Sequence, residues 1–274
     1  MDSPPKPKVI LFDIGGVCVI SPMQAILDYE LSNNIPQGWI NYAISKSAPN
    51  GFWHRLERGA ILLDDTFYDG FQTDLTSPSV WATFHSTKGT MPPPPLPKIN
   101  APILFNTMMT VATTTDPWMF PALQKLSQSG QFLLAALSNT VIFPPSHPLY
   151  TDNGIHPLHA LFDVFISSAH VGLRKPDPRV YALALSEADK FARKNVETER
   201  GRRLGWAGGI TAGDIVFLDD IGENLKAAKK AGFRTIKVPL GRAYEAVEEL
   251  EGLTGLELDG GHAKVPMGAS KAKI

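Results

Sequence analysis

Short apolar runs alternate with longer segments of helical period along much of the 274-residue chain. Five short, predominantly apolar runs end in polar or turn-forming residues, which is typical of strands buried in a parallel sheet. They span residues 9–12, 132–137, 162–166, 215–218 and 235–238. Helical segments lie between them at 119–129, from 178 through 185, at 222–231 and at 244–250. We expect residues 190–209 to form a surface loop or a helix extension.

The pattern changes between the first and second apolar runs. Residues 21–115 contain segments with helical spacing and lack the period-two alternation of half-buried strands. We expect helix pieces at 23–31, 39–44, 52–57 and 103–112, and a further helix that begins at Asp64-Asp65. Residues 77–90 are mixed. Four consecutive prolines make residues 91–97 an extended connector, because proline cannot occupy a helix interior.

Alternating strands and helices predict an α/β fold, a Rossmann-like doubly wound parallel sheet. The helical block interrupts this pattern after the first strand, so we expect it to form an inserted α-helical cap above the carboxyl ends of the strands. Residues 1–20 and 116–250 would form the discontinuous core, residues 21–115 the cap, and residues 251–274 a loose tail.

Composition narrows the function classes. A net charge of −1 gives no basis for electrostatic capture of nucleic acid or of an acidic membrane surface. The single cysteine, Cys18, excludes an intrachain disulfide and argues against a cysteine zinc site, and its place beside the first strand favours a buried hydrophobic role. No signal peptide and no run long enough to span a bilayer is visible, so we expect a cytoplasmic protein, either a monomer or a homodimer.

Polar residues stand where the predicted strands end. Because the carboxyl ends of parallel strands meet at one crevice, these side chains are expected to lie together. Carboxylates from two strands form a hard oxygen site suited to Mg²⁺, and a serine hydroxyl with a lysine ammonium suits a phosphate. Taken one at a time, the same residues are ordinary helix caps or solvated side chains. They are Asp13, Ser138-Asn139, Ser167-Ser168, Asp219-Asp220 and, shortly after the third strand, Lys175.

These positions carry a family resemblance. The chain reads F-D-x-x-G-V, then L-S-N-T, then V-G-L-R-K-P-D-P, then V-F-L-D-D-I-G-E-N-L-K-A-A. All four motifs, in this order, resemble the haloacid dehalogenase (HAD) superfamily of hydrolases. The last two segments, and I-P-Q-G-W-I-N from Ile35, are similar in particular to the amino-terminal phosphatase domain of soluble epoxide hydrolases. The resemblance covers residues 8–250, and no α/β-hydrolase segment follows, so it does not imply epoxide hydrolysis.

The resemblance implies a role for each matching residue. Asp13 would be the nucleophile that forms an aspartyl-phosphate, and Lys175 would neutralise the charge of Asp13 and of the phosphate. The phosphoryl group would be bound by Ile14, Gly15, Ser138, Asn139 and Lys175. Mg²⁺ would be held by Asp13, the Gly15 carbonyl, Asp219 and Asp220. The expected substrate is a small phosphorylated metabolite.

Position 15 departs from the family pattern. Phosphatases of this superfamily usually read D-x-D, and the second Asp serves as general acid and base, whereas this chain has Gly15. Loss of such a group costs about 10²–10⁴ in rate. A phosphatase could act on a low-pKa leaving group, such as a diphosphate or acyl phosphate, or could use His54 or Glu57 from the cap. For those two residues the alternative is a solvated helix face.

Two other readings of the sequence remain open at this stage. The chain could cleave C–P or C–halogen bonds, with Lys46 as the available Schiff-base lysine for the former, while the paired Asp219-Asp220 argues against the latter. It could also be a non-catalytic phospholigand-binding protein. The cap aromatics Trp39, Phe52, Trp53 and Trp81 suit either a lipid-like substrate or a hydrophobic core.

Two minor signals concern an arginine and the end of the chain. Arg174 either widens the anion site or faces solvent. The final residues, Ala272-Lys273-Ile274, resemble the S-K-L type of peroxisomal signal, and the alternative is a chance match in a basic tail.

Overall fold

The computed structural model describes residues 5–150 and 157–267, and its centre is a five-stranded parallel sheet with strand order β3-β2-β1-β4-β5. This is the Rossmann-like strand order 3-2-1-4-5-6 without the sixth strand. All five predicted strands are confirmed, with ends displaced by no more than two residues. They are β1 (Val9–Phe12), β2 (Leu133–Ser138), β3 (Val164–Ser167), β4 (Ile215–Asp219) and β5 (Arg234–Lys237).

Both faces of the sheet are covered by helices, which explains the nearly unbroken apolar strands. On one face, Ile10 and Phe12 pack in a cluster with α7 (Met119–Ser129) and α12 (Ala243–Thr254). On the other face, Val9 and Leu11 pack with α9 (Pro178–Lys194) and α11 (Gly222–Lys230). We call this sheet with its flanking elements the core. Its shorter elements are η1 (Pro157–Leu161), α8 (Ser168–Val171), α10 (Glu199–Arg203), η2 (Trp206–Gly208) and η3 (Ala212–Asp214).

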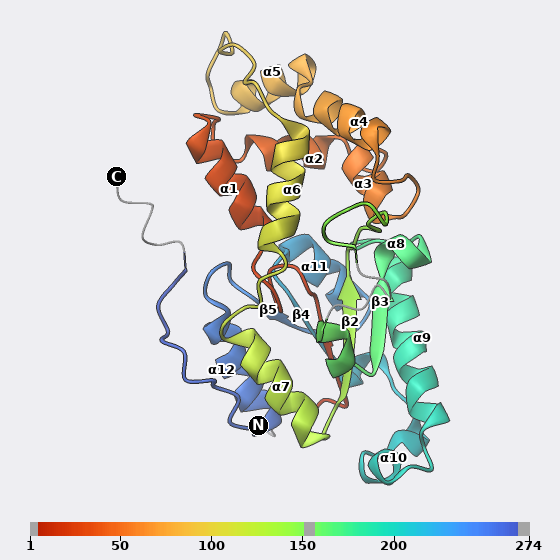
Figure 1. Cartoon of the computed structure of the whole chain (residues 1–274). Helices are drawn as coiled ribbons and strands as arrows, with labels where there is room; N and C mark the ends of the chain where they lie inside the picture. Colours follow the sequence, from red (N-terminus) through yellow and green to blue (C-terminus); the bar gives the residue numbers. More distant parts are fainter. Residues whose placement is uncertain (1–4, 151–156, 268–274) are drawn as a thin grey trace.

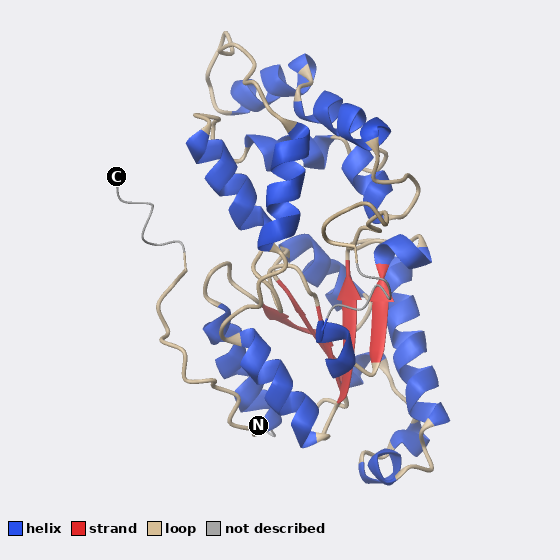
Figure 2. Cartoon of the chain, in the orientation of Figure 1, coloured by secondary structure: helices blue, strands red, loops and turns tan. Residues whose placement is uncertain are grey.

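Six helices between β1 and α7 form a separate layer, which we call the cap. Figure 1 shows it above the end of the sheet toward which the arrows of β2 and β3 point, and Figure 2 shows that it contains helices and loops only. Its position over the strand ends agrees with the expected insertion. The helices are α1 (Pro22–Ser32), α2 (Trp39–Lys46), α3 (Phe52–Glu57), α4 (Asp65–Leu75), α5 (Pro78–Thr87) and α6 (Ala101–Val111).

Local sequence signals explain where several helices begin and end. Asp64 caps α4 as predicted, because its carboxylate accepts a hydrogen bond from the Phe67 amide. Ser21 caps α1 in the same way through the Met23 amide, and a proline follows directly as the first helical residue. Gly130 ends α7 with φ of 59°, a left-handed conformation that glycine adopts without strain.

Aromatic side chains form the centre of the cap. Trp39, Trp53 and Trp81 are buried, and the ring of Trp39 meets that of Trp81 edge-on at 4.7 Å. Phe67 is fully buried and stacks on Phe71 at 5.4 Å. These rings therefore act as a hydrophobic core. In the core, Cys18 is likewise buried in the hydrophobic cluster around β1 and forms no disulfide, as predicted.

Several segments are more ordered than the sequence analysis predicts. The mixed stretch 77–90 contains α5. Residues 190–209, for which a surface loop or a helix extension is expected, contain the end of α9, which is such an extension, together with α10 and the buried Trp206. The predicted tail is not loose up to Met267. Leu258 is fully buried, the Glu251 carboxylate accepts hydrogen bonds from the Leu258 and Asp259 amides, and the Met267 amide donates to Gly241. A side chain of α12 and the backbone of Gly241 thus fix a segment whose local composition carries no signal.

Residues 268–274, which include the C-terminal Ala272-Lys273-Ile274, lie outside the described residues. Among the residues that are described, no helix combines the length and the apolar character needed to cross a bilayer.

Candidate active site

The carboxyl end of the sheet brings four of the predicted residues together. Asp13 directly follows β1, and its amide donates to the Leu218 carbonyl of the neighbouring β4. Asp219 is the last residue of β4 and Ser138 the last of β2. Lys175 enters from the loop before α9. All four side chains are buried, so their charges and hydroxyl groups face one another rather than bulk water.

Lys175 bridges two carboxylates. Its Nζ lies 2.8 Å from Asp13 Oδ1 and 2.8 Å from Asp219 Oδ2, and the residue is 1% exposed. Burial acts to lower the pKa of this ammonium, but the charges of Asp13 and Asp219 outweigh it and raise the pKa, so the lysine stays charged. Lys175 can therefore supply fixed positive charge beside the carboxylate of Asp13.

Asn139 holds the backbone of Lys175 in place. The Lys175 amide donates to Asn139 Oδ1 at 2.8 Å, and Asn139 Nδ2 donates to the Lys175 carbonyl at 3.3 Å. Both ends of this side-chain amide are thereby engaged by one residue. The structure thus gives Asn139 a positioning contact that the sequence did not indicate.

Three carboxylates surround a small space beside Lys175. Oxygen atoms of Asp13, Asp219 and Asp220 all lie within 4.8 Å of one another. Burial, assisted by the neighbouring Asp219, raises the pKa of Asp220 to about 6. Burial also raises the pKa of Asp13, against the opposing charge of Lys175. One ammonium does not balance three clustered carboxylates, so the site favours a further cation.

The donor set and one orphaned atom fit a hard divalent cation. Carboxylate oxygens are the ligands that Mg²⁺ prefers. Asp220 Oδ1 is buried and has no hydrogen-bond partner in the part of the chain that the structure describes, which is costly for a carboxylate oxygen unless a cation or water meets it. The residues therefore fit the metal that the resemblance implies.

Asn224 is a site residue that the sequence analysis did not single out. Its Nδ2 lies 3.0 Å from Asp219 Oδ1 and 3.1 Å from Oδ2, and its carbonyl accepts from the Tyr181 hydroxyl at 2.9 Å. The Ile221 amide also donates to Asp219 Oδ1 at 2.7 Å. Asn224 lies in the quoted segment D-D-I-G-E-N, five residues after Asp219, so its position on the first turn of α11 was the available signal.

The remaining predicted phosphate-binding residues surround Asp13. The Ile14 amide donates to Asp13 Oδ1 at 2.6 Å, which orients the carboxylate. Ser138 Oγ is close to its own chain, 3.4 Å from the Asn139 carbonyl, a weak contact that leaves the hydroxyl available to a ligand. A Cβ at Gly15 would meet only Pro22, at an ordinary 3.6 Å, so the backbone there does not require glycine.

Gly16 differs from Gly15 in this respect. It has φ of +77°, and a Cβ there would lie 2.2 Å from Asp220 Oδ2. Glycine at position 16 is therefore required for the close approach of Asp220. At position 15 the backbone does not require glycine, so the absence of a carboxylate there affects the chemistry of the site and not the fold.

The expectation that His54 and Glu57 form a solvated helix face is wrong. Both are buried, and Glu57 Oε2 accepts from Arg174 Nε and Nη2, each at 2.7 Å. The Glu57 carbonyl also accepts from the Ser168 hydroxyl at 2.5 Å. Arg174 consequently does not face solvent freely. Because it directly precedes Lys175, its ion pair with Glu57 links the cap to the loop that carries Lys175.

Neither cap residue is placed as a free proton donor. Burial raises the pKa of Glu57, but its carboxylate is paired with Arg174. Burial, with Arg174, lowers the pKa of His54 to about 4, and its Nδ1 has no partner among the described residues. Lys46 is exposed on α2, where its ammonium lies over the ring of Tyr42, so it does not join the carboxylate cluster.

Known proteins match this chain over most of its length, although none of the protein-family models does. It is 29% identical over 94% of its length to acyl-CoA dehydrogenase family member 10 of Mus musculus, of which it spans 20%. It is 26% identical over 82% of its length to sesquiterpene phosphatase astK of Aspergillus oryzae, of which it spans 86%. It is 24% identical over 94% of its length to bifunctional epoxide hydrolase 2 of Rattus norvegicus, of which it spans 41%. The chain thus covers less than half of two of these three relatives.

Among solved structures, a HAD-like family hydrolase from Porphyromonas gingivalis aligns with a TM-score of 0.51 and 17% identity, over 90% of this chain and 98% of the other. The α/β fold is therefore that of HAD-like hydrolases. The resemblance predicted from the four motifs is confirmed by this fold and by the sequence similarity to the phosphatase and the epoxide hydrolase.

Proposed function

We propose that this HAD-like chain is a Mg²⁺-dependent phosphatase that acts through an aspartyl-phosphate at Asp13 on a small phosphorylated compound with a good leaving group. The observation that carries the proposal is the buried carboxylate of Asp13, held 2.8 Å from Lys175 at the edge of a three-carboxylate cluster. Similarity to a sesquiterpene phosphatase supports the reaction class.

Each residue of the site would have its own role in phosphoryl transfer. Asp13 would attack the phosphorus, with its carboxylate oriented by the Ile14 amide, and water would then hydrolyse the aspartyl-phosphate. Lys175 and the Ser138 hydroxyl would bind the phosphoryl oxygens. Asp13, the Gly15 carbonyl, Asp219 and Asp220 would hold Mg²⁺, which supplies positive charge to the transferring phosphoryl group. Burial of these groups excludes bulk water and strengthens each electrostatic contact.

The absence of a proton donor at position 15 indicates which leaving groups the site can expel. Neither of the two cap residues considered replaces it, since Glu57 is paired with Arg174 and His54 stays neutral at pH 7. A leaving group of low pKa departs without protonation, so diphosphates, acyl phosphates or activated aryl phosphates suit this site better than alkyl monoesters.

A leaving-group series tests the proposal. Phosphate release from aryl phosphates of decreasing leaving-group pKa, and from an alkyl monoester, should be Mg²⁺-dependent and should rise steeply along the series. Asp13→Asn should release none, while Asp189→Asn, at a surface ion pair, should match the wild type. Release that is independent of Mg²⁺, or that persists in Asp13→Asn, would overturn the proposal.

Gly15→Asp sharpens the same test. The backbone at position 15 accepts a side chain, so the variant should fold. It should accelerate alkyl monoester hydrolysis by about 10²–10⁴ and flatten the dependence on leaving-group pKa. An unchanged steep dependence would mean that general acid catalysis is not what position 15 lacks.

A further inference from the structure

Ser21 occupies the point where the chain first passes from the core into the cap. It is 3% exposed, and its hydroxyl is shared between two contacts. Ser21 Oγ accepts from the Met23 amide at 3.2 Å as the cap of α1, and it donates to Asp220 Oδ2 at 3.3 Å. One hydroxyl group therefore touches both the first helix of the cap and a carboxylate of the cluster.

The contact leaves the two oxygens of Asp220 in different states. Oδ2 accepts from Ser21, while Oδ1 is buried without a partner among the described residues. A carboxylate fixed by one oxygen presents the other in a defined direction. Gly16 provides the necessary space, because a Cβ at that position would lie 2.2 Å from Oδ2 and 3.1 Å from Ser21 Oγ.

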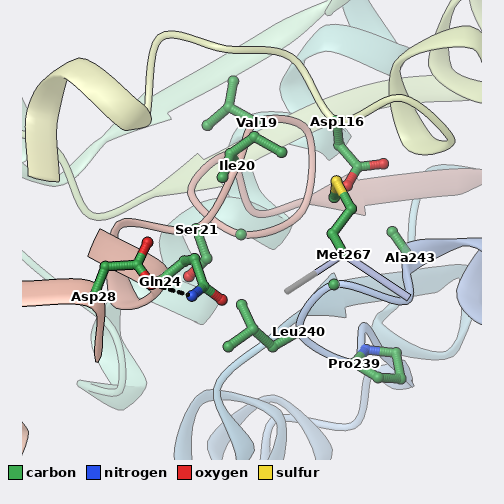
Figure 3. A pocket seen from close by; sticks show the side chains of 12 residues that line it. Val19, Ile20, Ser21, Gln24, Asp28, Asp116, Pro239, Leu240, Ala243 and Met267 are labelled. Carbon is green, nitrogen blue, oxygen red and sulfur yellow. Dashed lines mark hydrogen bonds between the residues drawn. The ribbon is translucent and has the colours of Figure 1, made fainter. Parts of the chain in front are cut away.

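Ser21 lies between the two chain crossings that join core and cap and a cavity beside them. The two chain crossings between core and cap pair with each other, since the Ile20 amide donates to the Thr114 carbonyl at 2.8 Å and Val19 pairs with Thr115. Next to this paired hinge is a cavity of about 290 Å³, lined by Ser21, by Gln24 of α1 and by Leu240 of the core (Figure 3). Ser21 is therefore buried but borders open space, so it is not enclosed by packed side chains on every side.

We propose that Ser21 is a positioning residue that couples the orientation of the cap to the metal-binding geometry of Asp220. With α1 in the present position, its hydroxyl fixes Asp220 through Oδ2 and leaves Oδ1 unpartnered for the metal. A shift of the first turn of α1 withdraws the hydroxyl and releases the carboxylate. This inference rests on the proposed function, because it takes the cluster to be a Mg²⁺ site.

Mg²⁺ titration of the full chain by isothermal calorimetry tests this without any substrate. Ser21→Gly removes the hydroxyl but keeps a residue that is tolerated as a helix cap. It should weaken Mg²⁺ binding about 10- to 100-fold, the usual effect of removing a group that orients a metal ligand. Ser21→Thr, which keeps the hydroxyl, should bind within about threefold of the wild type, following the same estimate.

Asn100→Gly is the matched control. Asn100 caps α6, another cap helix with proline in its first turn, through the Ile103 amide, and it lies outside the cluster. This variant should bind Mg²⁺ as the wild type does. Equal Mg²⁺ affinity in Ser21→Gly and the wild type would overturn the inference, as would an equal loss in Asn100→Gly. A wild type that binds no Mg²⁺ would overturn the proposed function, and this inference with it.

Discussion

The cap and the core both bury large side chains completely, but of different chemical kinds. The interior of the cap is mainly a set of aromatic rings around Phe67, which contact one another. The cap also buries the acids Glu30 and Glu57, which are held outside the cluster by backbone amides and by Arg174. The core has an equally apolar interior, but at the carboxyl end of its sheet it also buries Lys175 and Asp219. Burying charge is costly even when the charges are paired, so a cluster of buried charges is typical of a functional site. The chemistry therefore belongs to the core, and the cap contributes cover and alignment.

The largest difference between the regions should follow from removing the buried cation. Lys175→Met leaves Asp13 and Asp219 buried without their shared partner, which should lower the free energy of unfolding by about 3–5 kcal/mol in EDTA. Urea denaturation measures this. Lys190→Met, at an exposed ion pair, should stay within about 0.5 kcal/mol of the wild type. Equal stability of the two variants would contradict the claim that the positive charge of Lys175 stabilises the core.

A cavity in the aromatic centre should destabilise the cap by a comparable amount for a different reason. Phe67→Ala removes a fully buried ring and should cost about 3–4 kcal/mol of unfolding free energy, again by urea denaturation. Leu62→Ala, at a residue 76% exposed in the same region, is the control and should cost less than about 0.5 kcal/mol. A small loss for Phe67→Ala would show that the rings are not a packed core.

His54 should make the cap sensitive to acid. Its imidazole has a pKa of about 4 in the folded chain and 6.5 in a model peptide, so the unfolded chain binds the proton first as the pH falls. The contribution of His54 to stability is therefore fully present above pH 6.5, and about 2–3 kcal/mol of it is lost toward pH 4. His54→Gln should remove this slope from denaturation curves, whereas the exposed His262→Gln should retain it. The same slope in both variants would contradict the assignment.

The smallest predicted effect concerns the ion pair that joins the two regions. A double-mutant cycle on Glu57 and Arg174 should give a coupling energy of about 1–2 kcal/mol, because both side chains are mostly buried. The cycle on the exposed pair Arg242 and Glu245 should give about 0.3 kcal/mol. Equal coupling energies would mean that the link between cap and core is no stronger than a surface contact.

Sequence patterns predicted the sheet and the cluster because both are local signals. The strands β1 and β4 are apolar runs, each followed at once by a carboxylate of the cluster, as Phe12 is by Asp13 and Leu218 by Asp219. Parallel pairing then brings these ends together without further information. The lack of a general acid and base at position 15 could also be predicted, because the sequence itself shows glycine there.

The rest depended on contacts between distant segments. α3 has only six residues, too few to show which face is covered, and its partner Arg174 lies 117 residues beyond Glu57. The hydrogen bonds between Asn139 and Lys175 join residues that no sequence periodicity relates. The same holds for the hydrogen bond from Ser21 to Asp220. Such partners become apparent only when the fold is known.

The most direct test of the central claim is to look for phosphate on Asp13. The protein is mixed with an activated aryl phosphate and Mg²⁺, quenched in acid within one turnover, digested and analysed by mass spectrometry. We expect a phosphate adduct on the Asp13 side chain in the wild type, absent without Mg²⁺ and in Asp13→Asn. Phosphate release with no adduct on Asp13 at any time would contradict an aspartate nucleophile.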